Sequence, residues 1–140
     1  MSHMAAVDAM LERLGTQDLS MLVEVDGTLL FASDREGLAP LKETAFKQPH
    51  LLDGSDVILP AVGLAAAYLL IYAKVGRVYA RTMTHKARAA FNEEGIEHGA
   101  RGFAKTLPTK YAEMSADLDA RAKKAISPAA FVEELRRMLD

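Results

Sequence analysis

Cysteine and tryptophan are both absent from this chain of 140 residues. Without cysteine there is no disulfide, no cysteine-ligated zinc or iron–sulfur cluster, and no thiol nucleophile. Aromatic residues make up only 6% of the chain, which argues against a surface that stacks nucleic-acid bases. There is no basic excess either, because 17 Lys and Arg stand against 19 Asp and Glu. Nucleic-acid and anionic-membrane binders usually carry such an excess, so we expect neither partner.

No basic segment followed by an apolar one begins the chain, so we predict no signal peptide. A reducing cytoplasm suits a chain without cysteine, and we expect a soluble, cytoplasmic protein. Residues 1–4 (Met-Ser-His-Met) read as the remnant of an expression tag. No linker rich in proline, glycine or serine divides the rest, so residues 5–140 are predicted to form one domain.

The longest uncharged segment covers residues 57–73, between Asp56 and Lys74. Its 17 residues fall short of the roughly 20 that a transmembrane helix needs. We therefore predict one helix over residues 57–73, buried on nearly every side in the core of a soluble protein. Leu69 is expected to be buried in it.

Turn and periodicity signals place the other elements. Asp26-Gly27 joins two β-prone segments, which predicts a hairpin of strands at 20–25 and 28–33 with Met21, Val23 and Val25 on its buried face. We also expect strands at 77–83 and 96–103, and helices at 5–14 (ending at Gly15), within 37–48, and at 84–94, 108–125 and 128–139. This order predicts an α/β fold with a mixed sheet and helices on both faces.

The best candidate site is Thr84-His85-Lys86, where a helix is predicted to begin directly after a strand. Free backbone N–H groups at such a junction favour an anionic ligand. The plainer interpretation is a capped, solvated first turn.

Other polar segments allow two interpretations each. Residues 53–56 (Asp-Gly-Ser-Asp) suit either a cation or proton-transfer site or a turn that caps a helix. Arg101, in a glycine-rich segment, suits either an anion contact or a strand edge. His50 and His98 have no second histidine at metal-ligand spacing, so we expect no metal site and no cofactor.

Four segments carry a resemblance to a known family: LVEVDG at residues 22–27, REGLAPL at 35–41, VGLAAA at 62–67, and Val78-Tyr79. They resemble a small prokaryotic family of domains of unknown function that is similar in fold to the cytidine deaminases. The resemblance implies a three-layer α/β/α, cytidine-deaminase-like fold with a mixed sheet that starts with a β-hairpin. It also implies that the helices beginning near Ser55 and Thr84 converge on one pocket, with Thr84, His85 and Lys86 nearest a small anion and Ser55 and Arg101 as further lining.

The chain departs from the zinc deaminases and from this family. Zinc deaminases carry His-x-Glu and Pro-Cys-x-x-Cys, which would fall near residues 61–63 and 84–87, and neither motif is present. Leu64 stands where the family tends to have lysine, and Ala116-Asp117-Leu118-Asp119 stands where it tends to have a Cys-Pro-Met-Glu-like segment.

Three hypotheses for the function follow. The first is a deaminase-like domain of unknown function that lacks the zinc site and binds a small anionic ligand or a protein partner. The second is an enzyme that uses no zinc and works through the Thr84-His85-Lys86 helix start. The third is a sensory module of the PAS or roadblock kind. A homo-oligomer stays open in all three.

Overall fold

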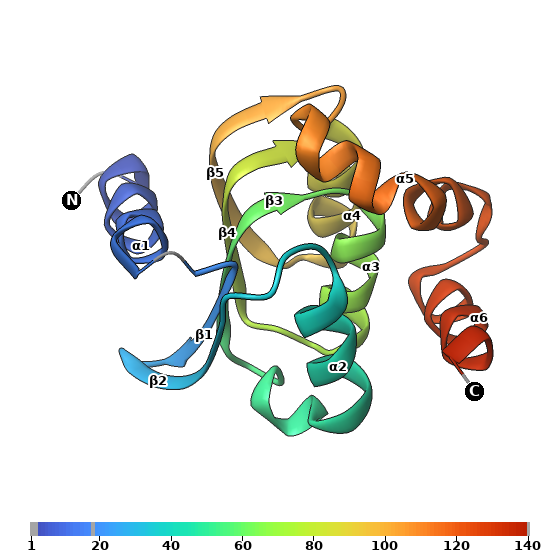
Figure 1. The fold of residues 1–140 in the computed structure, drawn as a ribbon, viewed down its shortest axis with the longest axis horizontal. Coiled ribbons are helices and arrows are strands. Elements are labelled where there is room, and N and C mark those ends of the chain that lie inside the picture. Colours follow the sequence, from blue (N-terminus) through green and yellow to red (C-terminus); the bar gives the residue numbers. More distant parts are fainter. Residues whose placement is uncertain (1–2, 18, 140) are drawn as a thin grey trace.

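The computed structural model describes residues 3–17 and 19–139. The chain forms a five-stranded sheet in the order β2-β1-β3-β4-β5 (Figure 1). The strands are β1 (Met21–Val25), β2 (Thr28–Ser33), β3 (Asp56–Val62), β4 (Arg77–Thr84) and β5 (Glu97–Ala104). The helices are α1 (His3–Gln17), α2 (Ala39–Lys47), α3 (Leu64–Tyr72), α4 (His85–Glu94), α5 (Thr109–Lys124) and α6 (Pro128–Leu139), with a short 3-10 helix η1 at Pro49–Leu51.

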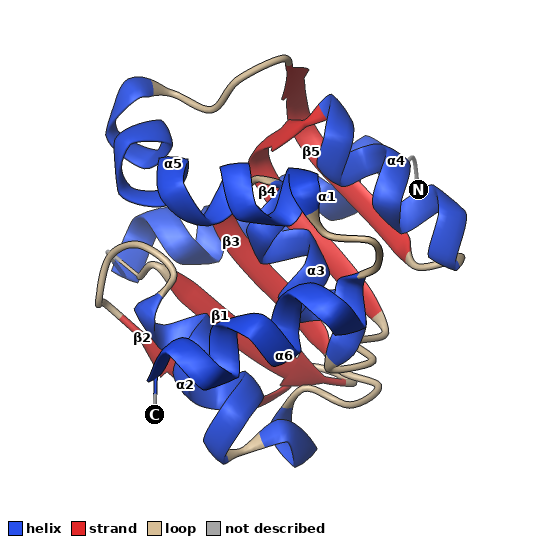
Figure 2. Ribbon diagram, turned by 90° about the vertical axis from the view of Figure 1, so that its right-hand side faces the viewer, coloured by secondary structure: helices blue, strands red, loops and turns tan. Residues whose placement is uncertain are grey.

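The sheet is mixed, as the sequence predicts. β1 runs antiparallel to β2 and β3, whereas β3, β4 and β5 are parallel to one another. Helix α1 covers one face, and α2, α3 and α4 cover the other, with α6 packed outside α3 (Figures 1 and 2). The predicted α/β class, the mixed sheet and the hairpin at its start are therefore confirmed.

The hairpin turns at Asp26 and Gly27, which both have positive φ, as the Asp-Gly pair predicts. Met21 and Val23 are fully buried on the α2–α3 side. The third residue predicted for this face, Val25, is 37% exposed, because it lies at the end of β1 next to the turn. Glu24, which faces the other side, is buried beneath α1. A strand covered on both faces does not alternate in burial.

The predicted single helix over residues 57–73 is wrong. Asp56–Val62 is strand β3, Gly63 is the N-cap, and only Leu64–Tyr72 is helical. β3 lies inside the sheet and is covered by helices on both faces, so both of its faces are apolar. Its sequence therefore lacks the two-residue alternation by which a strand can be told from a helix. Pro60 fits the strand because it lies beyond the part of β3 that pairs with β1.

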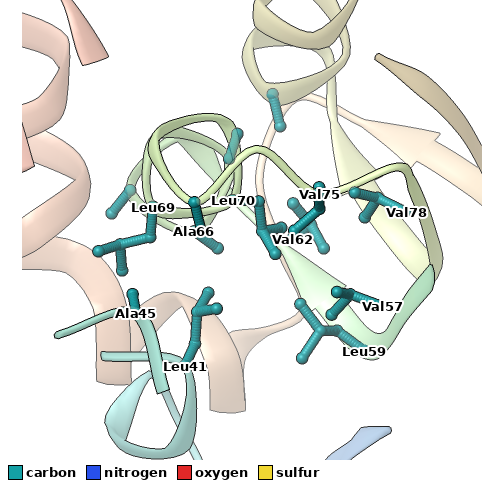
Figure 3. Packing of buried hydrophobic residues seen from close by; sticks show 14 of the residues in the cluster. Leu41, Ala45, Val57, Leu59, Val62, Ala66, Leu69, Leu70, Val75 and Val78 are labelled. Carbon is teal, nitrogen blue, oxygen red and sulfur yellow. The ribbon is translucent and has the colours of Figure 1, made fainter. Parts of the chain in front are cut away.

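The main core lies between the sheet and α3. Alanines and leucines of α3 meet the valines of β3 and β4 and the inner face of α2 (Figure 3). Leu69 has no exposed surface, as predicted. The small side chains Ala65, Ala66 and Ala67 let the helix approach the sheet closely.

Helix α1 builds a second, smaller core on the opposite face. Val7, Leu11 and Leu14 pack there against Leu22, Ile58 and Tyr79. The predicted stop at Gly15 is wrong, because α1 continues to Gln17 with Gly15 facing the guanidinium of Arg81. Met1 and Ser2 of the predicted tag remnant lie outside the described residues, and His3 and Met4 begin α1. Of the helices at residues 3–17 and 39–139, none has the length and apolarity to cross a membrane.

Candidate functional site

The carboxyl ends of the parallel strands β3, β4 and β5 meet at one edge of the sheet. Helices α3 and α4 begin there, directly after β3 and β4. Helix α5 lies beside the same strand ends and packs on α3 (Figure 1). In open α/β sheets, ligands bind in the crevice outside the carboxyl ends of the strands. A ligand site is therefore expected at this edge of the sheet.

A pocket at this edge collects three lysines, and we call it the lysine pocket. It holds about 900 Å³ of empty space, its open mouth included. Leu64, Thr84, Lys86, Lys105, Thr106, Leu107, Ala112, Ala116, Asp119, Ala120 and Lys123 line it. The three lysines come from three segments: α4, the connection after β5, and α5. Its remaining wall is mostly leucine and alanine.

The three lysines of the lysine pocket lie close to one another and form no ion pair with a carboxylate of the described residues. The pKa of Lys86 is lowered, chiefly because its amino group lies within hydrogen-bonding reach of Lys123, and further by desolvation and by the positive charges of Lys123 and Lys105. Across the described residues, none of these three lysines forms an ion pair with a carboxylate. The pocket therefore favours an anion.

Asp119 is the carboxylate in this pocket, and its two oxygens already accept hydrogen bonds. Oδ1 accepts from the backbone N–H of Ala65 at 2.9 Å, in the first turn of α3, and Oδ2 accepts from the Ser115 hydroxyl at 2.7 Å. A Cβ on Gly63 would lie 3.0 Å from Oδ2, so any other residue there would crowd the carboxylate and push it away by a few tenths of an ångström. Asp119 thus caps α3 from another helix, and no ion pair joins it to the three lysines in the described part of the chain.

Thr84 caps α4 as the sequence predicts. Its side-chain oxygen accepts a hydrogen bond from the backbone N–H of Ala87 at 3.1 Å. The cap fixes the first turn of α4 and with it the base of Lys86. Thr84 thus serves as a structural cap and as part of the pocket wall at once.

An apolar cavity lies next to the lysine pocket, beneath the first half of α5. It holds about 500 Å³ of empty space, its opening included. Ser20, Gly37, Leu38, Leu41, Leu59, Pro60, Ala61, Gly63, Ala66, Leu107, Tyr111, Met114, Ser115 and Asp119 line it. We call it the apolar cavity.

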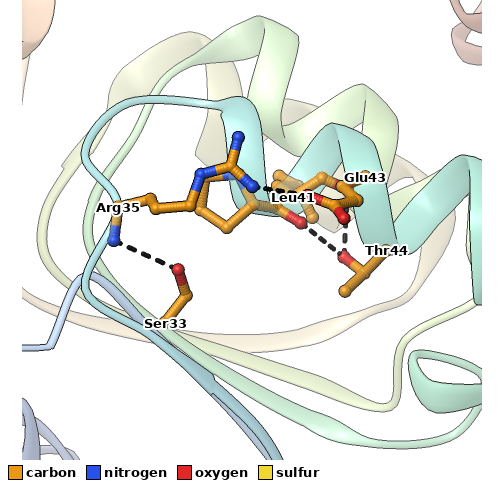
Figure 4. Close-up of polar contacts among 6 residues, drawn as sticks. Ser33, Arg35, Leu41, Glu43 and Thr44 are labelled. Carbon is orange, nitrogen blue, oxygen red and sulfur yellow. Dashed lines mark hydrogen bonds and ion pairs between the residues drawn. The ribbon is translucent and has the colours of Figure 1, made fainter.

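The wall of the apolar cavity at residues 37–41 is held by polar contacts behind it (Figure 4). The Ser33 hydroxyl accepts from the backbone N–H of Arg35, and the Arg35 guanidinium pairs with Glu43 of α2. The Thr44 hydroxyl donates to the carbonyl groups of Pro40 and Leu41. These contacts fix the entry into α2.

The structure does not bring all five predicted ligand-binding residues together. Thr84 and Lys86 line the lysine pocket, whereas His85 is exposed beside it and is not part of the wall. Arg101 points to the α1 face, where it pairs with Asp8 at 3.0 Å. Ser55 lies at the other end of the strands, buried, with its hydroxyl donating to the Leu52 carbonyl at 2.7 Å.

The predicted pocket shared by Ser55 and Thr84 is therefore wrong. Ser55 precedes Asp56, which pairs with Arg77 at the start of β4, whereas Thr84 ends that strand. At about 3.3 Å per residue, roughly 23 Å of strand separates them. The error follows from the helix predicted at residue 57: its N-terminus would have been at Ser55, but α3 begins only at Leu64.

Sequence reasoning missed Lys105, Lys123 and Asp119 as site residues. Asp119 and Lys123 have the spacing of a favourable i,i+4 pair on a helix, as do Asp117 and Arg121. The second pair forms, at 3.2 Å, but no ion pair joins Asp119 to Lys123 in the described chain. Asp119 turns to α3 instead, and only the packing of α5 on α3 shows this.

No grouping of three or more His, Asp or Glu side chains suited to a metal occurs within residues 7–15 and 19–138. His98 is hydrogen-bonded, with Nδ1 lying 2.8 Å from the Ile96 carbonyl and the ring against Phe91.

Comparison with known proteins identifies the family. The family model of the TM1506 type, a domain of unknown function (DUF1893), matches residues 9–109. The chain belongs to the DUF1893 family. The crystal structure of a DUF1893 family protein from Thermotoga maritima, TM1506, is similar over 99% of this chain and 92% of that chain, with a TM-score of 0.80 and 22% sequence identity. At that identity the likeness shows a shared fold. No curated protein matches the sequence.

The match to the DUF1893 family ends at Thr109, the first residue of α5. Thr84, Lys86 and Lys105 therefore lie inside the matched region, whereas Asp119 and Lys123 lie beyond it. The lysine pocket joins the matched domain to the helix that follows it.

Proposed function

We propose that this domain binds a small anionic ligand in the lysine pocket. The observation that carries the proposal is the meeting of Lys86, Lys105 and Lys123 around one pocket, with no carboxylate paired to any of them in the described part of the chain. Holding like charges together costs free energy, and a bound anion removes that cost. The backbone N–H groups of the first turn of α4 add positive partial charge at the same edge.

We further propose that the domain is deaminase-like and lacks the zinc site. The sheet order with its initial hairpin supports this, as does the position of residues 61–63 and 84–87. Val62 pairs with Met83, so the two segments lie side by side at the edge where α3 and α4 begin. Residues 61–63 read Ala-Val-Gly where the zinc signature has His-x-Glu, and residues 84–87 read Thr-His-Lys-Ala where it has Pro-Cys-x-x-Cys. Anion binding therefore takes the place of zinc chemistry.

Isothermal titration calorimetry with inorganic phosphate, pyrophosphate and acetate tests the anion site. Lys123→Ala should weaken binding about tenfold, since a hydrogen bond to a charged group contributes about 1.5 kcal/mol or more. Lys124→Ala is the matched control, because it removes the same charge from the next residue of α5 and Lys124 does not line the pocket. Equal losses in the two variants, or no binding of any of these anions at about 10 mM, would refute the proposal.

The affinity should also depend on pH. The pKa of Lys86 is lowered, so its charge is lost at a lower pH than that of an ordinary lysine. Anion affinity should therefore fall as the pH rises through that lowered value. Lys123→Ala should move the midpoint of this fall to higher pH, because the chief cause of the lowered pKa is removed.

A further inference from the structure

The lysine pocket and the apolar cavity are adjacent, because Leu107 and Asp119 line both. The charge of the wall changes from one to the other. The lysine pocket has three lysines in its wall, whereas the apolar cavity has none and is walled largely by leucine, alanine, proline and methionine. A ligand that fills both must be anionic at one end and apolar at the other.

Asp119 stands at the junction and adds a third requirement. A carboxylate has about four acceptor positions on its two oxygens, and Asp119 uses one on Oδ1 for Ala65 and one on Oδ2 for Ser115. It can accept further hydrogen bonds from a ligand. Its negative charge favours a cationic donor and disfavours a second anion at this point.

We propose that the two spaces form one binding site for an apolar α-amino acid. The ligand's carboxylate lies against Lys86 and Lys123, its ammonium donates to Asp119, and its side chain enters the apolar cavity. An α-amino acid carries its carboxylate, its ammonium and its side chain on one carbon, so it can reach the lysines, Asp119 and the apolar cavity from the place where the two spaces share Leu107 and Asp119. The inference rests on the proposed anion site for the carboxylate, and it adds the ammonium and the apolar group.

The wall of the apolar cavity agrees with this class of ligand. Leu38, Leu41, Leu59 and Met114 are among its lining residues, so it offers apolar contacts to a branched or thioether side chain. Burying a side chain the size of leucine contributes about 1.5 kcal/mol or more. Leucine should therefore bind at least about tenfold more tightly than glycine.

Calorimetry on the full chain with four ligands tests the inference. L-leucine carries all three parts, 4-methylpentanoate lacks the ammonium, 3-methylbutylamine lacks the carboxylate, and glycine lacks the apolar group. We expect leucine to bind more tightly than each of the others by about tenfold or more. If leucine binds no more tightly than 4-methylpentanoate or glycine, the inference is refuted on the unmodified chain, whatever any variant does.

Two variants assign the contacts. Asp119→Asn keeps an oxygen for the Ala65 N–H but removes the charge, so it should weaken leucine about tenfold and leave 4-methylpentanoate unchanged or tighter. Ala61→Leu narrows the apolar cavity and should weaken leucine without affecting glycine. Equal effects of Asp119→Asn on leucine and 4-methylpentanoate would refute the ammonium contact.

The same titrations separate this inference from the proposed function. Phosphate or 4-methylpentanoate binding that depends on Lys123, without a preference for leucine, leaves the anion site standing and overturns the amino-acid site. If Lys123→Ala and Lys124→Ala lose anion affinity equally, both the anion site and the amino-acid site are refuted.

Discussion

The ion pair between Glu24 and Arg13 offers a demanding test of how α1 is held on the sheet. Glu24 lies in β1 with no exposed surface, and Arg13 of α1 approaches it with a side chain that is 41% exposed. Neither Glu24 oxygen accepts a hydrogen bond of regular geometry from the described residues. The buried carboxylate therefore depends on the charge of Arg13, so removing Arg13 should cost far more than removing an arginine from a surface pair.

The expected loss of stability in Arg13→Ala lies between the values for a fully buried and a fully exposed ion pair. Removing one partner of a fully buried pair costs about 3–5 kcal/mol, whereas an exposed pair contributes about 0–1 kcal/mol. Since Glu24 is fully buried and Arg13 is partly exposed, we expect Arg13→Ala to lower the free energy of unfolding by about 2 kcal/mol. At roughly 4 °C per kcal/mol for a chain of this size, the Tm should fall by about 8 °C.

A double-mutant cycle with Glu24→Gln isolates the pair, which matters because Arg13 has a further interaction of its own. In the Glu24→Gln background no buried charge is left behind, so adding Arg13→Ala should cost at least 1 kcal/mol less than it does alone. Urea denaturation followed by circular dichroism gives the four free energies. A coupling below about 0.5 kcal/mol, the scatter expected for independent sites, would show that water rather than Arg13 compensates Glu24.

Four further outcomes follow from the structure. Leu69→Ala should cost about 2–5 kcal/mol in urea denaturation, because the side chain is fully buried, and a loss below about 0.5 kcal/mol would contradict that burial. Gly76→Ala should cost about 1–3 kcal/mol, since its Cβ would lie 2.8 Å from the Gly54 carbonyl oxygen; an unchanged Tm would mean that this segment shifts freely. Thr84→Ala should cost about 1 kcal/mol by removing the cap of α4, and Thr84→Ser should restore most of it. Elemental analysis after dialysis should find no stoichiometric zinc, because no cysteine is present, and one zinc per chain would contradict this expectation.

Elements with local signals at their ends could be predicted from the sequence. The Asp26-Gly27 turn, the Thr84 cap and Gly95, which has a φ of 72° at the end of α4, each set a boundary through the conformation of one or two residues. Such signals act within a few residues, so they do not depend on the rest of the fold. The hairpin and α4 were predicted for this reason.

The segment at residues 57–73 could not be divided by the same means. Burial on both faces of β3 removes the alternation that would mark a strand, and α3 is so apolar that it lacks a polar face. Pro60 and Gly63 are the residues at which the sequence departs from a continuous helix. Ser55 was assigned to the wrong end of the sheet as a direct result.

In the candidate site, too, some residues could be found from the local sequence and others only from the tertiary structure. Thr84 and Lys86 could be found because a strand-to-helix junction is visible in the sequence. Asp119 and Lys123 join them only through the packing of α5 on α3, at a distance of 54 positions in the case of Asp119 and Ala65. Lys105 joins them through the pairing of β5 with β4, which places Ala104 opposite Thr84. No spacing rule within a single element predicts such a contact.

The hydrogen bond from Ala65 to Asp119 means that the proposed ligand binding would be thermodynamically linked to the attachment of α5. Helix α5 carries both Asp119 and Lys123 and packs on α3 and α6, so a site that needs these side chains exists only while α5 is docked. A ligand at about 100 times its Kd would then stabilise the docked helix by about 2.7 kcal/mol. In hydrogen–deuterium exchange, that linkage would slow the amides of α5 about 100-fold while leaving β1 and β2, at the far side of the sheet, unchanged.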